Sequence, residues 1–196
     1  MRICSLMVLL VLLAISPALA AEAGRTPAPF QSVSARFVQE KHLNILQTPL
    51  VSRGTFTFKL PASLRWEYLE PVHTVLLMAD DRVEKFIERD GRLEPEESMF
   101  AGAMQYILPE IGNWLDGRFG ENRIFHSEER DARTVVLTPK DEGMRSVISQ
   151  IELHLGEQLG VVESVTISEG PASSTVLRFY DIVVNGRIPE DRFRLK

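Results

Sequence analysis

Residues 54–68 read GTFTFKLPASLRWEY, and this stretch decides the fold class of the chain. Apolar and polar side chains alternate over residues 54–60, and the alternation resumes after Pro61 through Leu64, Trp66 and Tyr68. Successive side chains of a β-strand point to opposite faces of a sheet. The period of two therefore predicts two neighbouring strands that share one apolar face.

Turn signals separate further β-rich runs: Glu70–Pro71, Asp80–Asp81, Asp90–Gly91, Glu169–Gly170–Pro171 and Asn185–Gly186. Asp-Gly and Asn-Gly pairs are the strongest short hairpin signals. We therefore expect one hairpin at residues 90–91 and a second at 185–186, which would join strands 176–184 and 187–195. The spacing predicts a meander of about nine strands, mostly antiparallel.

The later predicted strands repeat the same alternation. They cover residues 134–139, 146–155 and 161–168. In the second of these strands, one face is predicted to carry Val147, Ile151, Leu153 and Leu155. The sheet is thus expected to have one apolar and one polar face.

Two segments show helical spacing instead. Val33, Phe37 and Val38 predict a short helix over residues 30–42. Residues 98–117 carry apolar side chains at intervals of three and four, which predicts an amphipathic helical segment. Because Pro109 breaks a continuous helix, we expect two short helices there, the second ending before Gly117.

The N-terminus has the organisation of a cleavable signal peptide over residues 1–20: a basic start, a short apolar run and small residues up to Ala20. Residues 21–29 predict a flexible lead-in and residues 30–196 a single domain. Cys4, the only cysteine, lies inside the leader. The mature chain is therefore expected to be exported, without disulfides and without a membrane anchor.

Composition and motifs exclude several classes of function. The chain has 22 Lys and Arg against 27 Asp and Glu, a net charge of -5, which argues against a nucleic-acid partner. No nucleophile elbow, phosphate-binding glycine loop or metalloprotease helix motif is present. The histidines are too far apart in sequence for a metal site, and the acidic residues over 80–97 fit a solvated face. We therefore expect no catalytic residue, metal or cofactor.

The balance between sheet and helices is the more informative feature. An ordinary core, with helices covering the inner face of the sheet, is the simplest interpretation. About nine strands have an inner face to cover, however, and only three short helices are predicted. Either the sheet curls on itself or it leaves an apolar hollow, which can shelter an acyl chain.

Three groups of residues resemble the LolA-type periplasmic lipoprotein carriers. They are FVQEK at 37–41, SRGTFTF at 52–58 with PASLRWEY at 61–68, and the closing FYDIVVNGRIPEDRF at 179–193. The resemblance implies a mainly β, α+β fold: an unclosed antiparallel β-barrel, or half-barrel, with a helical lid over an apolar cavity. It also implies a periplasmic carrier that takes acylated lipoproteins from an inner-membrane transporter to an outer-membrane acceptor, with no cofactor.

The expected ligand-binding residues follow from the pattern and the resemblance together. On the apolar face of the sheet they are Phe37, Phe56, Phe58, Leu64, Trp66, Tyr68, Met78, Ile151, Leu153, Leu177 and Phe179. In the lid they are Phe100, Met104, Ile107, Leu108, Ile111 and Trp114. The family places a lid-fastening arginine where this chain has Leu60, while Arg65 is expected to face the other side. This departure is compatible with another amphiphilic lipid, such as a glycolipid, as cargo.

Two alternatives stay open at this point. One is a periplasmic docking or accessory subunit of a lipid or glycolipid export system, which would bind a protein partner without carrying lipoproteins. The other is a hydrolase with an acid site in the cavity, which no sequence motif supports. A stable protein complex retained without lipid would favour the docking subunit, and turnover of a lipid ester by the pure protein would favour the hydrolase.

Overall fold

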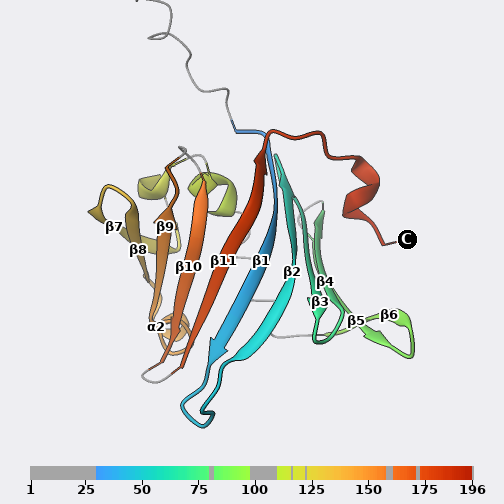
Figure 1. Cartoon of the computed structure of the whole chain (residues 1–196). Helices are drawn as coiled ribbons and strands as arrows, with labels where there is room; N and C mark the ends of the chain where they lie inside the picture. The colour runs from blue at the N-terminus through green and yellow to red at the C-terminus, as the bar shows by residue number, and fades with distance from the viewer. Residues whose placement is uncertain are drawn as a thin grey trace, which may run out of the picture.

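The computed structural model describes residues 30–79, 82–97, 110–115, 117–121, 123–157, 161–170 and 173–195. The strands of these residues form one antiparallel sheet of 11 strands in the order β6-β5-β4-β3-β2-β1-β11-β10-β9-β8-β7 (Figure 1). The sheet is curved and unclosed, because its two edge strands β6 and β7 lie far apart (Figure 1). The expected half-barrel is confirmed.

The strands are β1 (Ser32–His42), β2 (Leu50–Lys59), β3 (Ser63–Glu70), β4 (Thr74–Ala79), β5 (Arg82–Arg89), β6 (Arg92–Pro95), β7 (Phe125–Asp131), β8 (Thr134–Pro139), β9 (Gln150–Leu155), β10 (Val162–Glu169) and β11 (Ser173–Val184). The helical elements are residues 110–115, η1 (Phe119–Glu121), α2 (Glu142–Arg145) and η2 (Glu190–Phe193). None of the helices in the described ranges is long and apolar enough to cross a membrane.

The helix predicted over residues 30–42 is wrong, since this segment is the central strand β1. It pairs with β2 along its whole length and with β11 from the other end of the chain, for example Phe37 with both Gly54 and Phe179. The spacing of Val33 and Phe37 fits a strand as well as a helix. Tertiary pairing on both sides overrides the local helical preference.

The hairpin predicted at Asn185–Gly186 is also wrong. Asn185 has a positive φ of 57°, but no strand follows it in the described residues up to 195. Instead its side-chain Oδ1 accepts hydrogen bonds from the backbone N–H groups of Gln31 (2.7 Å) and Ser32 (3.3 Å). The turn residues thus join the two ends of the chain, and residues 186–195 leave the sheet.

Two other hairpin predictions are confirmed. Asp90 and Gly91 both have positive φ, 52° and 77°, and connect β5 to β6. Gly170, with a φ of 69°, follows β10, which pairs with β11. The strand predicted from residue 146 begins later, at Gln150, because α2 precedes it, and Val147 is 64% exposed rather than on the apolar face.

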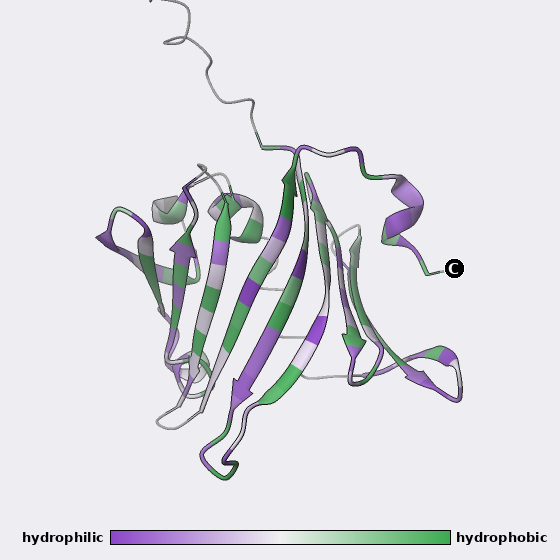
Figure 2. Cartoon of the chain, in the orientation of Figure 1, coloured by the Kyte–Doolittle hydropathy of each residue, from purple (hydrophilic) through white to green (hydrophobic). Residues whose placement is uncertain are grey.

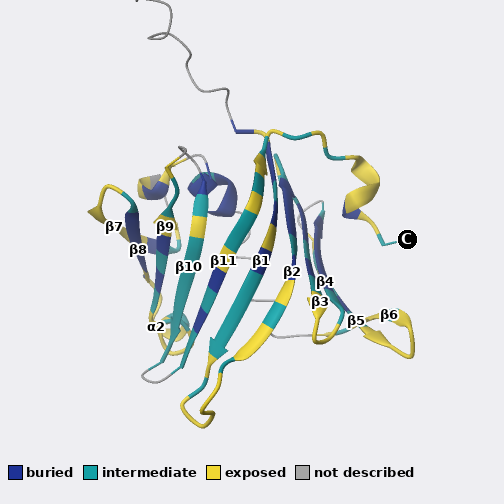
Figure 3. Ribbon diagram, viewed as in Figure 1, coloured by how far each residue is buried: buried dark blue, intermediate teal, exposed yellow. Residues whose placement is uncertain are grey.

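The curved sheet has an inner, concave face and an outer face, and hydrophobic and hydrophilic residues alternate along several of its strands (Figure 2). The main core lies on the inner face and draws on strands from both halves of the sheet, with its most buried members shown dark in Figure 3. Its fully buried side chains include Phe37, Phe58, Leu64, Leu137, Ile151, Leu153 and Leu177. One predominantly apolar face is therefore confirmed.

A helix in the connection between β6 and β7 covers part of the inner face. Residues 96–124 join β6 at one edge of the sheet to β7 at the other edge. The described helix of this link, residues 110–115, buries Ile111, Trp114 and Leu115 in the main core. Gly117, with a φ of 73°, donates from its backbone N–H to the carbonyl of Trp114 and ends the helix as predicted.

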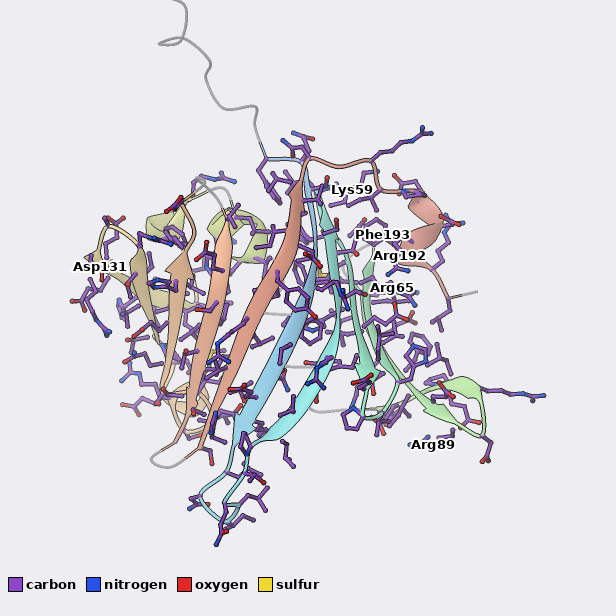
Figure 4. All side chains as sticks on the ribbon, viewed as in Figure 1. Lys59, Arg65, Arg89, Asp131, Arg192 and Phe193 are labelled. Atoms are coloured by element: carbon purple, nitrogen blue, oxygen red, sulfur yellow. The ribbon has the colours of Figure 1, made fainter. Side chains whose placement is uncertain are left out.

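A smaller apolar cluster lies on the outer face. It consists of Val75, Leu77 and Phe86, with Leu93 and Leu195 packed against them. The C-terminal segment, residues 186–195, contacts β3 and β4 through η2. Figure 4 shows its Arg192 and Phe193 on the same side of the sheet as Lys59 and Arg65.

Candidate functional site

Five aromatic rings form a continuous cluster on the inner face: Phe37, Phe56, Trp66, Tyr68 and Phe179. Phe37 is fully buried and contacts the rings of Trp66, Tyr68 and Phe179 at centroid distances of 5.8, 5.1 and 6.4 Å. Phe56 lies edge-on to Trp66 at 5.4 Å and 5.8 Å from Phe179. Such edge-to-face contacts add to the stabilisation from burial. The cluster spans β1, β2, β3 and β11.

The predicted residues of the sheet all lie in or against this core. Phe37, Phe56, Phe58, Leu64, Met78, Ile151, Leu153 and Leu177 are buried members of it, and Trp66, Tyr68 and Phe179 pack against it with partial exposure. Of the predicted lid residues, Ile111 and Trp114 belong to the same core. Phe100, Met104, Ile107 and Leu108 lie outside the described residues.

Apolar contact fastens the described helix of the link to the sheet. A Cβ placed on Gly112 would lie 3.5 Å from both Leu60 Cδ2 and Phe58 Cζ, so the helix backbone packs directly on these two side chains. Trp114 adds an edge contact to Phe125, with centroids 6.0 Å apart. Leu60 thus holds the helix by packing at the position where the family has an arginine. Arg65 faces the other side of the sheet, as expected.

Two indole N–H groups on the inner face have no hydrogen-bond partner in the part of the chain that the structure describes. They belong to Trp66 and Trp114, and both nitrogen atoms are buried. A buried unpaired donor costs about 1–3 kcal/mol. An acyl chain whose ester or amide carbonyl reached either nitrogen would remove that cost.

Polar residues border the aromatic cluster at two places. The Tyr68 hydroxyl donates to Gln39 Oε1 at 2.9 Å, and burial raises the pKa of Tyr68. Lys85 lines a cavity of about 30 Å³ together with Trp66, Tyr68, Thr74 and Leu76. This volume is that of about one water molecule. Little free space is therefore left between these rings and their neighbours at this point.

A polar cluster on the outer face holds the C-terminal segment. Arg65 donates to both carboxylate oxygens of Glu67, at 2.8 and 3.0 Å, and to the carbonyl oxygen of Arg194 at 3.3 Å. Arg192 lies 3.5 Å from the same carboxylate. These cations, Arg65 foremost, lower the pKa of Glu67 to about 2.

His73 extends this outer cluster to β5. Its Nε2 lies 2.9 Å from Glu67 and its Nδ1 2.8 Å from Glu88. The hydrogen bond to Glu67, and secondarily that to Glu88, raises the pKa of His73. The cluster connects β3, β5 and the C-terminal segment on the face of the sheet opposite the aromatic rings.

Sequence reasoning missed the residues that depend on β1 being a strand. Gln39 and Lys41 face the inner side at the end of the sheet near the β1–β2 turn, where Lys41 pairs with Glu169 at 2.9 Å. Glu169 also accepts from the Thr175 hydroxyl at 2.9 Å. The alternation of Val33, Ala35 and Phe37 was the signal that would have placed them.

The N-terminal strands match a known family. Residues 28–87 match the model of the family described as outer membrane lipoprotein carrier protein LolA. Among curated proteins, no sequence matches the chain. The family match covers the region that contains Gly54, Phe56 and Trp66, where the sequence resemblance was strongest.

Solved structures resemble most of the chain at low sequence identity. A DUF1329 family protein from Desulfovibrio piger has 10% identity and a TM-score of 0.46, over 84% of this chain and 90% of that chain. A LolA superfamily protein from Nitrosomonas europaea has 10% identity and a TM-score of 0.44, over 86% and 92%. The MucA/MucB complex of Pseudomonas aeruginosa has 15% sequence identity and a TM-score of 0.39. The match covers 85% of this chain and 56% of that chain.

The first strands of the chain therefore resemble the LolA family in sequence, and the single unclosed sheet is the half-barrel that this resemblance implies.

Proposed function

We propose that the protein is a periplasmic carrier that holds the acyl chains of lipoproteins, or of a related amphiphilic lipid, against the inner face of its sheet and ferries them from the inner to the outer membrane. The observation that carries this proposal is the cluster of five aromatic rings on the inner face, in a core against which the helix of residues 110–115 also packs. A carrier needs an apolar surface that can be covered and uncovered, and this arrangement supplies one.

Burial of acyl chains supplies the binding energy. Each CH₂ group removed from water contributes about 0.8 kcal/mol, so ten methylenes contribute about 8 kcal/mol before ordering costs. Part of this energy is spent in separating side chains that pack on one another in the empty protein. That cost keeps the affinity moderate, and release to an acceptor then requires only that the acceptor stabilise the empty, packed state or offer a better site.

No catalytic step enters the proposal. The inner face is lined by aromatic and aliphatic side chains, and the proposed binding surface carries out no bond-making chemistry. The described residues contain no group of three or more histidine, cysteine or acidic side chains able to hold a metal ion.

Mass spectrometry tests the proposed function directly. Mature protein would be purified from the periplasm without detergent, and both an organic extract and a protease digest would be analysed. Acylated N-terminal cysteine peptides are the expected result for a lipoprotein carrier, and a free lipid or glycolipid identifies the other cargo class. Protein that is stoichiometrically empty would contradict the carrier function.

A matched pair of variants places the cargo on the inner face. Trp66→Asp puts a charge into the aromatic cluster and is expected to abolish copurified lipid. Leu69→Asp, in the same strand but 53% exposed, is expected to retain it. Circular dichroism verifies that both variants fold. If the folded Trp66→Asp variant copurifies with the same amount of lipid, Trp66 does not belong to the binding site.

A protein-docking role is the second candidate, because one end of the sheet exposes large apolar side chains. At the β1–β2 and β3–β4 turns these are Ile45, Leu46, Leu50, Val51, Leu69 and Val72. Exposed apolar groups at neighbouring turns are typical of interaction surfaces. If the protein is empty, a stable protein complex that is lost in Leu69→Asp would favour this role.

A further inference from the structure

We propose that the polar headgroup of the bound amphiphile leaves the interior through a slot between β10 and β11, and that this headgroup is uncharged and rich in hydroxyl or amide groups. The inference rests on the proposed carrier function and adds to it the exit of the headgroup and its chemical class.

The slot begins where β10 and β11 stop pairing. Their last pair at this end is Ser164 with Arg178, yet β11 continues to Val184 beside β1. Asp181 takes a positive φ of 52°, and the pairing of β11 with β1 shifts register between Ser34 and Arg36. A bulge of this kind bends a strand away from its former neighbour. A crevice of about 790 Å³ lies at this point, within the range of about 300–1,000 Å³ for small-molecule sites.

The lining of the crevice changes from apolar to polar. On the inner side are Val161, Phe179 and Ile182, which belong to or pack against the apolar interior. Phe179 also contacts Phe56 of the aromatic cluster, with centroids 5.8 Å apart. An acyl chain on the cluster therefore has a continuous apolar path to the slot.

The outer rim is polar and includes Arg133, His154, Glu163, Ser164, Arg178 and Asp181. Figure 1 shows β10 beside β11, with the helix of residues 110–115 behind the upper ends of these strands. An amphiphile placed in the slot would have its chain among the aromatic rings and its headgroup at the rim.

Charge pairing at the rim selects the headgroup class. Arg133 lies 3.2 Å from Glu163, and Arg178 lies 3.0 Å from Glu40. Asp181 lies 3.6 Å from Arg36 on the neighbouring strand. Each of these cations already has a carboxylate beside it, so an anionic headgroup that approached the cation would be repelled by that carboxylate. Hydroxyl and amide groups can instead bridge between the paired donors and acceptors, because they both donate and accept hydrogen bonds.

Photo-crosslinking of the unmodified protein tests the exit. The probes are a diacylated lipopeptide and a glycosyl diacylglycerol, each carrying a diazirine on its headgroup, so that the two probes distinguish amide from sugar headgroups. Label is expected on peptides that contain residues 154–164 and 178–182. Label at Lys41 and Glu169, at the opposite end of the inner face, or label shared between both ends, would overturn the proposal.

Two variants of β10 test the slot independently. Ser164→Phe fills the crevice, and Ser168→Phe adds the same bulk at the other end of the strand, beside Gln150 and Ser174. Ser164→Phe is expected to raise the Kd of both probes at least tenfold, while Ser168→Phe leaves it within twofold. Equal probe affinities of the unmodified protein and the two variants would overturn the proposed exit between β10 and β11.

A comparison of charged and uncharged lipids tests the proposed class of headgroup. Phosphatidylglycerol of the same chain length is expected to bind the unmodified protein at least tenfold more weakly than the two uncharged probes, and equal binding would overturn the headgroup class. If the unmodified protein binds no acyl probe at all, the carrier function itself fails, whereas binding that persists in Ser164→Phe leaves that function intact.

Discussion

The ring of Phe37 lies directly over Gly54, its partner on the neighbouring strand. A Cβ at Gly54 would lie 2.8 Å from Phe37 Cζ and only 1.9 Å from the backbone oxygen of Glu67. Gly54, in the middle of β2, therefore lies in direct contact with the central ring of the aromatic cluster. Its absent side chain allows β3 and Phe37 to approach together.

Gly54→Ala is expected to destabilise the protein by about 3 kcal/mol, because backbone atoms of β3 cannot yield to the added methyl group. Urea denaturation followed by tryptophan fluorescence measures the change. Gly120→Ala serves as the control, since a Cβ at Gly120 would meet nothing within 4 Å. Equal stability of Gly54→Ala and the unmodified protein would show that Phe37 does not rest on this glycine.

Glu67→Gln is expected to cost about 3 kcal/mol at pH 7, since it leaves the buried Arg65 guanidinium without a counter-charge. The folded-state pKa of Glu67 is lowered from 4.5 to about 2. The stabilisation is therefore complete above pH 4.5 and is lost as the pH falls through 2. Urea midpoints of the two proteins are expected to converge over this range.

The exposed Glu70 provides the matched control for Glu67. It lies 3.4 Å from Arg53, and both side chains are more than half exposed. Glu70→Gln is therefore expected to change stability by less than about 0.5 kcal/mol. If Glu70→Gln loses as much stability as Glu67→Gln, burial of the Arg65–Glu67 pair does not explain the cost of the Glu67 substitution.

His73→Gln is expected to remove a pH dependence on the neutral side. The pKa of His73 is raised by Glu67 and Glu88, so its stabilisation is complete below the unfolded value of 6.5 and is lost as the pH rises through the folded value. Melting temperatures of the unmodified protein should therefore fall as the pH rises from 6, while those of the variant stay flatter. Parallel profiles would exclude an ion pair of His73 with the two carboxylates.

Phe193→Ala tests whether the C-terminal segment stabilises the sheet. Phe193 is 5% exposed in η2, which packs on β3 and β4. Its truncation is expected to cost about 3 kcal/mol. Arg187→Ala, at an exposed position of the same segment, should leave the urea midpoint unchanged. If Phe193→Ala also leaves the urea midpoint unchanged, the C-terminal segment does not stabilise the sheet.

Local sequence patterns correctly predicted the features of the fold that depend on neighbouring residues. The alternation from Gly54 to Tyr68 gave two strands with the right side chains on the inner face, and Asp90–Gly91 gave a turn in which both residues have positive φ. These features depend on neighbouring residues alone. Most of the candidate inner surface followed from them, because the side chains of paired strands share a face.

The tertiary structure decided what the local patterns left ambiguous. Residues 32–42 form a strand because β2 and β11 flank them on both sides, and Asn185 ends a strand because its side chain binds the backbone of Gln31 and Ser32. The outer cluster of Arg65, Glu67, His73 and Arg192 exists only once the register and the C-terminal segment are in place. The sequence by itself therefore determined the alternating strands and their apolar face, whereas pairing between distant segments decided the central strand and the path of the C-terminal segment, because the hydrogen bonds that fix both lie between residues far apart in the chain.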